Sequence, residues 1–425
     1  MAEPNHEGNQ RAAQTSSPYR PGFNQSPMVL AGRDDILAAA DEAIVTATLD
    51  HRMPPPLLVV GPRGVGKTVL LGEIAGRAGT TYGWPRLHVE VGPNQPFTPA
   101  LARDAAALTS VFADAPSGRR FRASEAVLRA QVAGVGGEIK FARDQLDPVA
   151  PLELRTILTK LAEAAANSQS GFVLTLDELQ LTERDELSQL AAVLQLAAGE
   201  EWPIVVAGAG LAGMRDPSRA VSYFERADWY DIGTLNEAET LLALKGPAAS
   251  AGRPLDGDAA EYLARCTGGY PYAIQLYGHH AWRASTGQDH IDLAAVQSAE
   301  NTAGAQLERG LYASRWAQTP ERERRYLAVA ADLVAAGKVV TGGVVAAEMG
   351  TTAQRLSTAR DRLIRRGTLT SEGEVLRFAV PGMASYVQRQ FQVEYGADAA
   401  AVTRTAAQNL NAVKARRPRG HDFGR

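Results

Sequence analysis

The chain has 425 residues, of which 45% are hydrophobic, a length that predicts roughly two or three folded domains. Its 44 basic and 47 acidic residues leave a formal net charge of -3, so overall charge gives no argument for a nucleic-acid partner. The single cysteine, Cys266, excludes an internal disulfide framework, and no apolar run approaches the roughly 18 residues of a membrane span. We therefore expect a soluble, cytoplasmic protein without a membrane partner.

The N-terminal part of the chain changes character at residue 28. Residues 1–27 are rich in Asn, Gln, Ser and Pro and lack hydrophobic periodicity, so we expect a disordered tail. The amphipathic stretch around Ile36, Leu37 and Ile44 predicts a helix, and the apolar run at 57–60 predicts a buried strand. Further strands are predicted at 86–91, 172–176 and 203–207, with helices at 99–111 and 151–166. This alternation predicts a parallel α/β sheet.

Residues 126–143 interrupt the alternation of strands and helices. Two segments with alternating apolar residues flank a glycine-rich stretch at 133–137, which predicts a β-hairpin inserted into the α/β core. The residues leave open whether such a hairpin covers an edge of the sheet or contacts a partner.

The strongest functional signal follows the first predicted strand. The pattern G-x-x-x-x-G-K-T is formed by Gly61, Pro62, Arg63, Gly64, Val65, Gly66, Lys67 and Thr68. Glycines allow several backbone N–H groups to converge on phosphate oxygens at the positive end of the next helix. Lys67 would add a cation at the β- and γ-phosphates, and Thr68 a hydroxyl for Mg²⁺. The pattern predicts a nucleotide-binding phosphate loop.

Two acidic residues come directly after the predicted strand at 172–176. Open α/β sheets bind their ligands at the carboxyl ends of the strands, which is where Asp177 and Glu178 are expected. Asp177 would hold Mg²⁺ opposite Thr68, and Glu178 would deprotonate the attacking water. The alternative is a pair of exposed acids at the start of the next helix.

GPRGVGKT, followed by LDELQ after a buried strand and then by a helical lid, resembles the AAA+ and STAND ATPases. The resemblance is strongest to bacterial and archaeal proteins related to replication-initiator ATPases, and it extends over residues 31–391. It implies a P-loop ATPase with ATP and Mg²⁺ as cofactors. The segment AGRDD at 31–35 is similar to a motif of that group whose following helix lies over the adenine.

The resemblance assigns further residues and also shows two departures. Arg226 stands where AAA+ proteins carry an arginine finger, acting in cis or across a subunit contact, although a surface pair with a neighbouring acid explains it equally well. The segment GAG at 208–210 replaces the usual polar sensor, which argues against fast turnover. In GGYPY at 268–272, Pro271 resembles the proline of STAND switch ATPases, which packs near the nucleotide; alternatively it simply starts a helix.

The C-terminal part of the sequence predicts helices at 322–336, 344–348 and 352–366, followed by two short strands, an order that resembles a winged helix-turn-helix. The third helix has five arginines and one acid, a local charge of +4. Its arginines would contact DNA or an acidic protein surface, and those placed on nearly one face are Arg355, Arg362 and Arg366. The basic residues near 414–419 are typical of a charged tail.

These patterns predict a tail at 1–27, an ATPase domain at 28–235, a helical lid at 236–316, a winged-helix domain at 317–395 and a basic tail at 396–425. The favoured function is a slow ATP-hydrolysing switch whose nucleotide state controls lid and winged helix. It would act on an unidentified protein partner or through self-association. The alternative is an ATP-dependent DNA-binding initiator or transcriptional regulator, and a third hypothesis is a scaffold that binds ATP only for stability.

Overall fold

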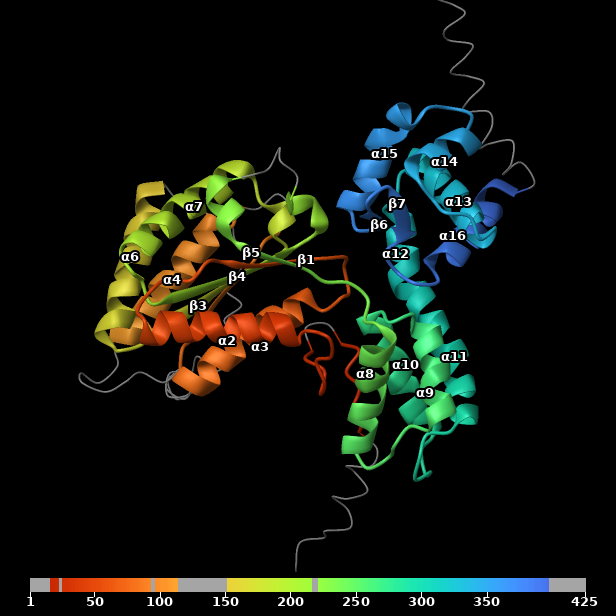
Figure 1. The fold of residues 1–425 in the computed structure, drawn as a ribbon, viewed down its shortest axis with the longest axis horizontal. Coiled ribbons are helices and arrows are strands. Elements are labelled where there is room, and N and C mark those ends of the chain that lie inside the picture. Colours follow the sequence, from red (N-terminus) through yellow and green to blue (C-terminus); the bar gives the residue numbers. More distant parts are fainter. Residues whose placement is uncertain (1–15, 23–24, 93–95, 114–150, 216–220, 397–425) are drawn as a thin grey trace, which may run out of the picture.

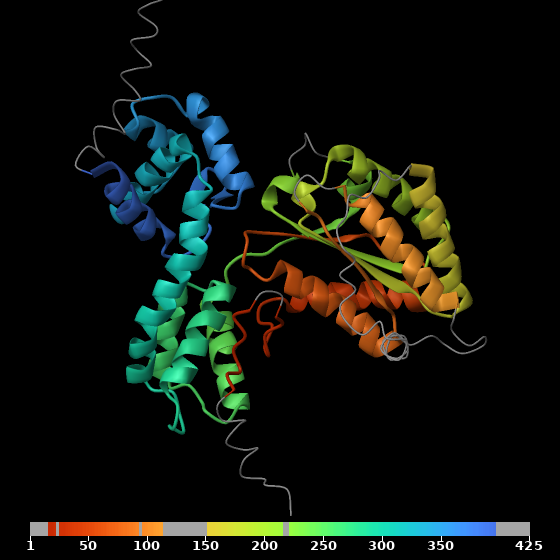
Figure 2. The same cartoon turned by 180° about the vertical axis from the view of Figure 1, so that it is seen from behind.

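The computed structural model describes residues 16–22, 25–92, 96–113, 151–215 and 221–396. They form a sheet-bearing half and a helical half, which lie side by side in both views (Figures 1 and 2). The hairpin expected at 126–143 and the tail from residue 397 onward lie outside the described residues. None of the helices in the described ranges has the length and apolar character that a bilayer crossing requires.

The sheet is parallel, with the strand order β2-β3-β4-β1-β5. Its strands are β1 (Leu57–Val60), β2 (Arg86–Glu90), β3 (Phe172–Asp177), β4 (Ile204–Gly210) and β5 (Asp228–Asp231). Because all of them run in one direction, their carboxyl ends meet at one edge of the sheet. The phosphate loop follows β1 and Asp177 ends β3, so both lie at that edge. The parallel α/β fold predicted from the sequence is confirmed.

Helices cover both faces of the sheet (Figure 1). One face carries α2 (Asp34–Leu49) and α3 (Lys67–Tyr82), and the other carries α4 (Thr98–Ala113), α6 (Pro151–Asn167) and α7 (Arg184–Gly199). Alternate side chains of the strands point to opposite faces, so Val59 and Val173 pack in the first core and Leu58 and Leu174 in the second. Burial on both faces explains the continuous apolar runs of the central strands.

The helical half begins with a lid of four helices. They are α8 (Glu237–Ser250), α9 (Gly257–Thr267), α10 (Pro271–Ala284) and α11 (Leu293–Leu307). Asn236 and Glu239 form a reciprocal capping box at the start of α8, which fixes where the lid begins. At its far end, α11 continues through a π-helical turn (Glu308–Tyr312) into α12 (Ala313–Ala317). The chain therefore leaves the lid without an intervening loop.

The C-terminal module, residues 313–395, follows directly. After α12 it contains α13 (Glu321–Ala335), α14 (Gly342–Glu348), α15 (Ala353–Arg365), β6 (Leu369–Glu372), β7 (Val375–Phe378) and α16 (Met383–Tyr395). The strands β6 and β7 pair antiparallel, and an isolated bridge joins Thr341 to Val375. Three helices and a hairpin therefore follow one another in the order that a winged helix would have. Helix α16, which the sequence did not predict, packs on α13.

The expectation that residues 1–27 form a disordered tail is wrong for the segment around Tyr19. The Tyr19 side chain is 2% exposed, and its hydroxyl donates to the Leu244 carbonyl at 2.5 Å. Its ring lies against Gly278 of α10, where an added Cβ would come within 2.5 Å of the ring. One aromatic anchor that fits beside a glycine outweighs the polar composition of its neighbours, because its burial offsets the entropy of ordering.

Candidate nucleotide site

The loop between β1 and α3 wraps around the side chain of Lys67. Gly64 and Gly66 adopt φ values of +83° and +93°, a region that favours glycine. Lys67 is the first residue of α3, and its Nζ donates to the carbonyls of Gly61 at 3.0 Å and Pro62 at 2.8 Å. The side chain is 6% exposed. The sequence pattern thus folds into a turn that encloses a buried cation at a helix N-terminus.

The electrostatic surroundings of Lys67 favour an additional anion. Burial lowers the pKa of Lys67 from its usual value to about 8, because a charged amine is poorly solvated there. Glu178 and Asp177 raise the pKa, whereas the cations Arg63 and Arg315 lower it further. A phosphate bound in the loop would supply negative charge beside the amine and favour its protonated form.

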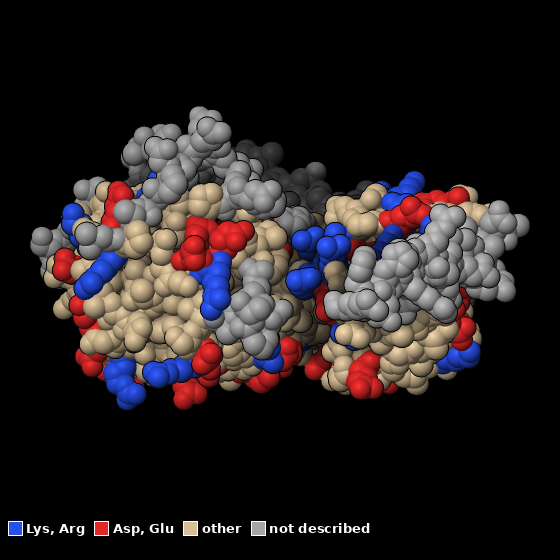
Figure 3. Space-filling view, turned by 90° about the horizontal axis from the view of Figure 1, so that it is seen from above, with Lys and Arg blue, Asp and Glu red and all other residues tan. Residues whose placement is uncertain are grey.

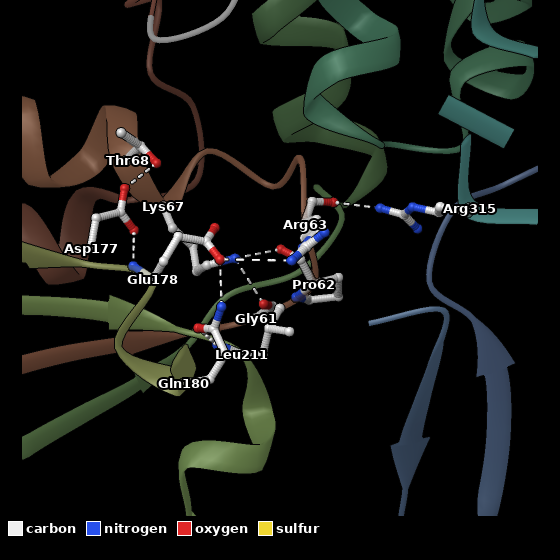
Figure 4. Close-up of polar contacts among 10 residues, drawn as sticks. All are labelled: Gly61, Pro62, Arg63, Lys67, Thr68, Asp177, Glu178, Gln180, Leu211 and Arg315. Atoms are coloured by element: carbon white, nitrogen blue, oxygen red, sulfur yellow. Dashed lines mark hydrogen bonds and ion pairs between the residues drawn. The ribbon is translucent and has the colours of Figure 1, made fainter. Parts of the chain in front are cut away.

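Asp177 connects the end of β3 to the start of α3. It is 2% exposed, and its Oδ2 accepts a short hydrogen bond from the Thr68 hydroxyl. Its Oδ1 accepts from the backbone N–H of Glu178 at 2.8 Å (Figure 4). Hydroxyl and carboxylate oxygens are the ligands that Mg²⁺ prefers in proteins. The residues present therefore fit a magnesium ion, and Thr68 and Asp177 would hold it.

Glu178 stands in an unusual backbone conformation beside the loop. Its φ is +55°, a left-handed value that few residues other than glycine adopt. Its Oε2 lies 3.9 Å from an Arg63 guanidinium nitrogen, and the two side chains are 26% and 48% exposed. An ion pair that long and that exposed contributes little stability. The Glu178 carboxylate thus lies at the edge of the sheet and forms only a weak ion pair with Arg63.

Gln180 provides a polar group where β4 has none. Its Nε2 donates a short hydrogen bond to Glu178, and its Oε1 accepts from the Leu211 N–H at 3.0 Å. An added Cβ at Gly210 would lie 3.0 Å from that same amide oxygen and 2.0 Å from the Met214 sulfur. The lack of a side chain at the end of β4 therefore leaves room for Gln180, which joins Glu178 to this strand end.

The carbonyl of Arg63 receives two donors from the helical half. Tyr270, which is 1% exposed and precedes α10, donates its hydroxyl at 2.8 Å. Arg315 of α12 donates to it at 3.4 Å (Figure 4). The Arg315 guanidinium also bonds the Gly367 carbonyl at 3.3 Å. At Gly64 an added Cβ would lie 1.9 Å from the Tyr270 hydroxyl oxygen, so this close approach requires glycine. The phosphate loop is the meeting point of the two halves.

Comparison with known families identifies the sheet-bearing half. Residues 29–206 match the family model described as an AAA ATPase domain. The chain carries an AAA+ P-loop ATPase domain. Its chemistry is nucleotide hydrolysis, which agrees with the loop and the two acids at the carboxyl edge of the sheet. Residues 309–387, which begin just before α12, match a domain of unknown function (DUF8462). No curated protein matches the sequence.

Solved structures share this fold at low sequence identity. The Walker-type ATPase PABY2304 of Pyrococcus abyssi is 14% identical, with 88% of this chain and 98% of that chain covered and a TM-score of 0.57. Cdc6p from Pyrobaculum aerophilum is 15% identical (87% and 97% covered, TM-score 0.46), and the Aeropyrum pernix Orc1 protein in complex with DNA is 17% identical (89% and 96%, TM-score 0.42). The TM-score of 0.57 shows that the chain shares the fold of PABY2304.

The structure places Arg226 away from the phosphate loop of its own chain. Arg226 is exposed and precedes β5, whose first residue, Asp228, pairs with Leu57 at the start of β1. Arg226 thus lies near the amino ends of these strands, whereas the loop follows their carboxyl ends. Parallel register separates Arg226 from the loop of its own chain by the length of a strand, which favours the second of the two roles left open, action across a subunit contact, over action in cis. A role across a subunit contact stays a prediction.

The lid motif GGYPY contacts the phosphate loop through Tyr270. Pro271 is the first residue of α10 and pre-organises its first turn. The structure records the polar contact with the phosphate loop at Tyr270, not at Pro271. The packing of Pro271 near a nucleotide therefore stays a prediction.

Two of the three arginines proposed for DNA contact are engaged within the C-terminal module. The guanidinium of Arg366 lies 2.6 Å from a carboxylate oxygen of Glu323, and that of Arg362 lies 3.8 Å from the other oxygen. Glu323, on α13, has 3% of its side chain exposed. Arg355 is exposed. Part of the positive charge of α15 therefore compensates a buried acid of its own module.

Sequence reasoning missed three polar side chains of this site. Gln180 and Tyr270 belong to the motifs LDELQ and GGYPY, so the sequence indicated that both residues lie near the site. Arg315 had no such signal, because its position beside the loop results from the way α12 packs against the ATPase domain.

Proposed function

We propose that this chain is an ATP-hydrolysing switch in which the bound nucleotide sets the positions of the lid and the C-terminal module. The observation that supports it most directly is the shared acceptor on the phosphate loop. One carbonyl, that of Arg63, is bonded by Tyr270 at the start of α10 and by Arg315 of α12. Any movement of this loop on binding phosphate changes both contacts, and a ligand shifts an equilibrium through such differences between states.

The hydrolytic step uses residues of the sheet edge. Lys67 would neutralise charge on the β- and γ-phosphates, while Thr68 and Asp177 would hold Mg²⁺. Magnesium, when bound, supplies positive charge next to the transferred phosphoryl group. Glu178 would accept the proton of the attacking water. If the chain self-associates, Arg226 would act in the site of a neighbouring copy.

The test combines hydrolysis with a measurement of shape. Full-length protein that hydrolyses ATP and shows different small-angle scattering with ADP and with a non-hydrolysable ATP analogue supports the switch. Hydrolysis with identical scattering in both states would leave an ATPase that is not a switch. Binding without hydrolysis would favour the scaffold hypothesis.

A DNA-binding initiator or regulator is the alternative for the C-terminal module. Exposed arginines of α15 and its C-cap favour it: Arg355, Arg362, Arg365 and Arg366. Lys and Arg side chains also gather on the helical half beside its boundary with the sheet-bearing half (Figure 3). Against it, Arg362 and Arg366 pair with Glu323, and an added Cβ at Gly213 of the ATPase domain would lie 3.2 Å from the Arg365 side chain. The C-terminal end of α15 is thus already packed against the ATPase domain.

A further inference from the structure

Arg315 is an arginine without a carboxylate. Its guanidinium donates to two backbone carbonyls, those of Arg63 and Gly367, at 3.4 and 3.3 Å. Among the described residues, no Asp or Glu oxygen lies within ion-pair distance of it. Arg63 and Lys67, the nearby cations of the loop, add to its positive surroundings. Besides the two long carbonyl contacts, Arg315 bonds the Tyr270 side chain. A partly buried guanidinium with these neutral partners, among other cations, is a favourable site for an anion.

The cations beside the loop exceed what its own acids balance. Asp177 is committed to Thr68 and to the backbone of Glu178, and Glu178 is bonded by Gln180. Burial lowers the pKa of Arg315 from its ordinary value; Tyr270 opposes this shift, and the positive charge of Arg63 adds to it. Phosphate would compensate this excess of charge. A guanidinium also binds phosphate through two parallel N–H groups, which a carbonyl contact does not use.

Helix α12, which carries Arg315, is bonded to the rest of the C-terminal module. Tyr312, at its N-terminal end, donates its hydroxyl to the Pro381 carbonyl at 2.5 Å. The Trp316 indole N–H donates to Glu394 of α16 at 2.6 Å, and the Arg324 guanidinium lies 4.9 Å from the centre of the Trp316 ring. These contacts join α12 to α16, to the residues before α16 and to α13. A shift of α12 would therefore be passed on to the module.

The π-helical turn before α12 determines which way Arg315 points. Such a turn contains one extra residue, so every later side chain is rotated by about 100° around the helix axis. The turn spans Glu308–Tyr312, three residues before Arg315. Helices contain π-helical turns rarely, and often at functional sites. Here the turn directs an arginine from beyond the lid toward the phosphate loop.

We propose that Arg315 is a phosphate ligand of the bound nucleotide and the residue through which the C-terminal module responds to nucleotide. Phosphate draws the guanidinium away from the carbonyls of Arg63 and Gly367, which loosens the contact between Gly367 and the loop and shifts α12. This inference rests on the proposed switch and names its coupling residue.

The test compares full-length wild type with Arg315→Gln, which keeps a donor for the carbonyls but loses the charge, and with Arg315→Lys, which keeps the charge but loses the fork. Arg283→Gln is the matched control, because Arg283 is exposed near the C-terminal end of α10 and lies outside the π-helical turn. Calorimetry measures affinity for ADP and for a non-hydrolysable ATP analogue. Hydrogen exchange reports the backbone of 311–319 and 365–369 in each state.

We expect Arg315→Gln to bind the ATP analogue about tenfold or more weakly, with Arg315→Lys intermediate and Arg283→Gln like wild type. The exchange difference between nucleotide states should vanish only in the Arg315 variants. Affinity within twofold of wild type in Arg315→Gln, with the exchange difference retained, overturns the proposal while the switch stands. No exchange difference in wild type overturns the switch and the coupling role, and a loss of affinity in Arg315→Gln would then still support the phosphate contact.

Discussion

Two polar clusters meet at the phosphate loop, and they are built differently. The hydrolytic cluster, Lys67, Thr68, Asp177 and Glu178, lies within the sheet-bearing half, and Asp177 and Lys67 are almost fully buried. The coupling cluster, Tyr270, Arg315 and Gly367, comes from the helical half. Tyr270 donates to the Arg63 carbonyl at 2.8 Å, whereas Arg315, which also bonds the Tyr270 side chain, lies 3.3 and 3.4 Å from its two carbonyl acceptors. Bonds at that length are weaker than bonds near 2.9 Å. The hydrolytic residues are thus held at the rigid edge of the sheet, whereas the contacts of Arg315 with the two carbonyls break more easily.

The difference has a consequence for function. A hydrolytic site must hold its groups within fractions of an ångström through each turnover, and the ends of buried parallel strands provide such a frame. A switch must change contacts at a small free-energy cost, which long bonds to carbonyls allow. Variants in the two clusters should therefore differ in their effects. Those in the hydrolytic cluster should change the rate of hydrolysis, and those in the coupling cluster should change how the C-terminal module responds to nucleotide.

The largest effect is expected for Glu178→Gln, which keeps the size of the side chain but removes the base. Hydrolysis should fall about 1000-fold, while the affinity for ATP stays within a few-fold of wild type. Single-turnover hydrolysis and calorimetry measure the two quantities. Hydrolysis at the wild-type rate would show that a group other than Glu178 accepts the proton of the attacking water.

Lys67→Ala should weaken nucleotide binding about 100-fold, because it removes a charged donor from a poorly solvated loop. The pKa of about 8 adds a sharper test with Lys67→Arg as the control. Since this pKa lies below the usual value for lysine, the free protein at pH 8 lacks part of the proton, and bound phosphate favours the protonated form. Wild type should therefore take up about half a proton on binding at pH 8.

Proton uptake is measured by calorimetry in buffers of different ionisation enthalpy. Lys67→Arg stays charged at pH 8, so it should bind without this uptake. Equal uptake by both proteins would mean that Lys67 is not the group that titrates. At pH 6, far below the pKa of Lys67, the contribution of this residue should disappear in wild type as well.

A smaller effect is expected for Gln180→Ala. Loss of the amide releases Glu178 from the end of β4, so kcat should fall about tenfold with KM little changed. The matched control is Gln195→Ala, because Gln195 is exposed on α7. Affinity for ADP with aluminium fluoride, a mimic of the transferred phosphoryl group, should fall in parallel with kcat. A normal kcat in Gln180→Ala would reduce this residue to a structural link.

The hydrolytic cluster was readable from the sequence because its residues belong to two short segments, each tied to a strand end. Lys67 and Thr68 follow β1 within one loop, and Asp177 and Glu178 follow β3, so local pattern and strand direction place them together. The coupling cluster joins residues more than 200 positions apart, as Tyr270 and Arg63 show. Such contacts depend on how lid, loop and module pack, which periodicity does not encode.

In two places tertiary contacts also differ from what the local composition predicts. Tyr19 stands in a polar segment and is nevertheless buried against Gly278, because its fit depends on a surface formed by distant helices. Likewise the positive charge of α15 was readable, whereas its compensation was not, since Glu323 lies on another helix of the module. The sequence therefore predicts the charge of a side chain better than it predicts the partner with which that side chain pairs.

The smallest effect is expected for charge reversal on α15. If Arg362 serves chiefly to compensate Glu323, the Arg355→Glu, Arg362→Glu double variant should leave affinity for duplex DNA within about twofold of wild type. If α15 reads DNA, log affinity should instead fall steeply with log salt in wild type, and the double variant should lose that binding. Mobility-shift titrations at two salt concentrations, with ADP and with a non-hydrolysable ATP analogue, separate the two. DNA binding by wild type in only one nucleotide state would support both the switch and the DNA-binding hypothesis, because the phosphate loop would then control access to α15.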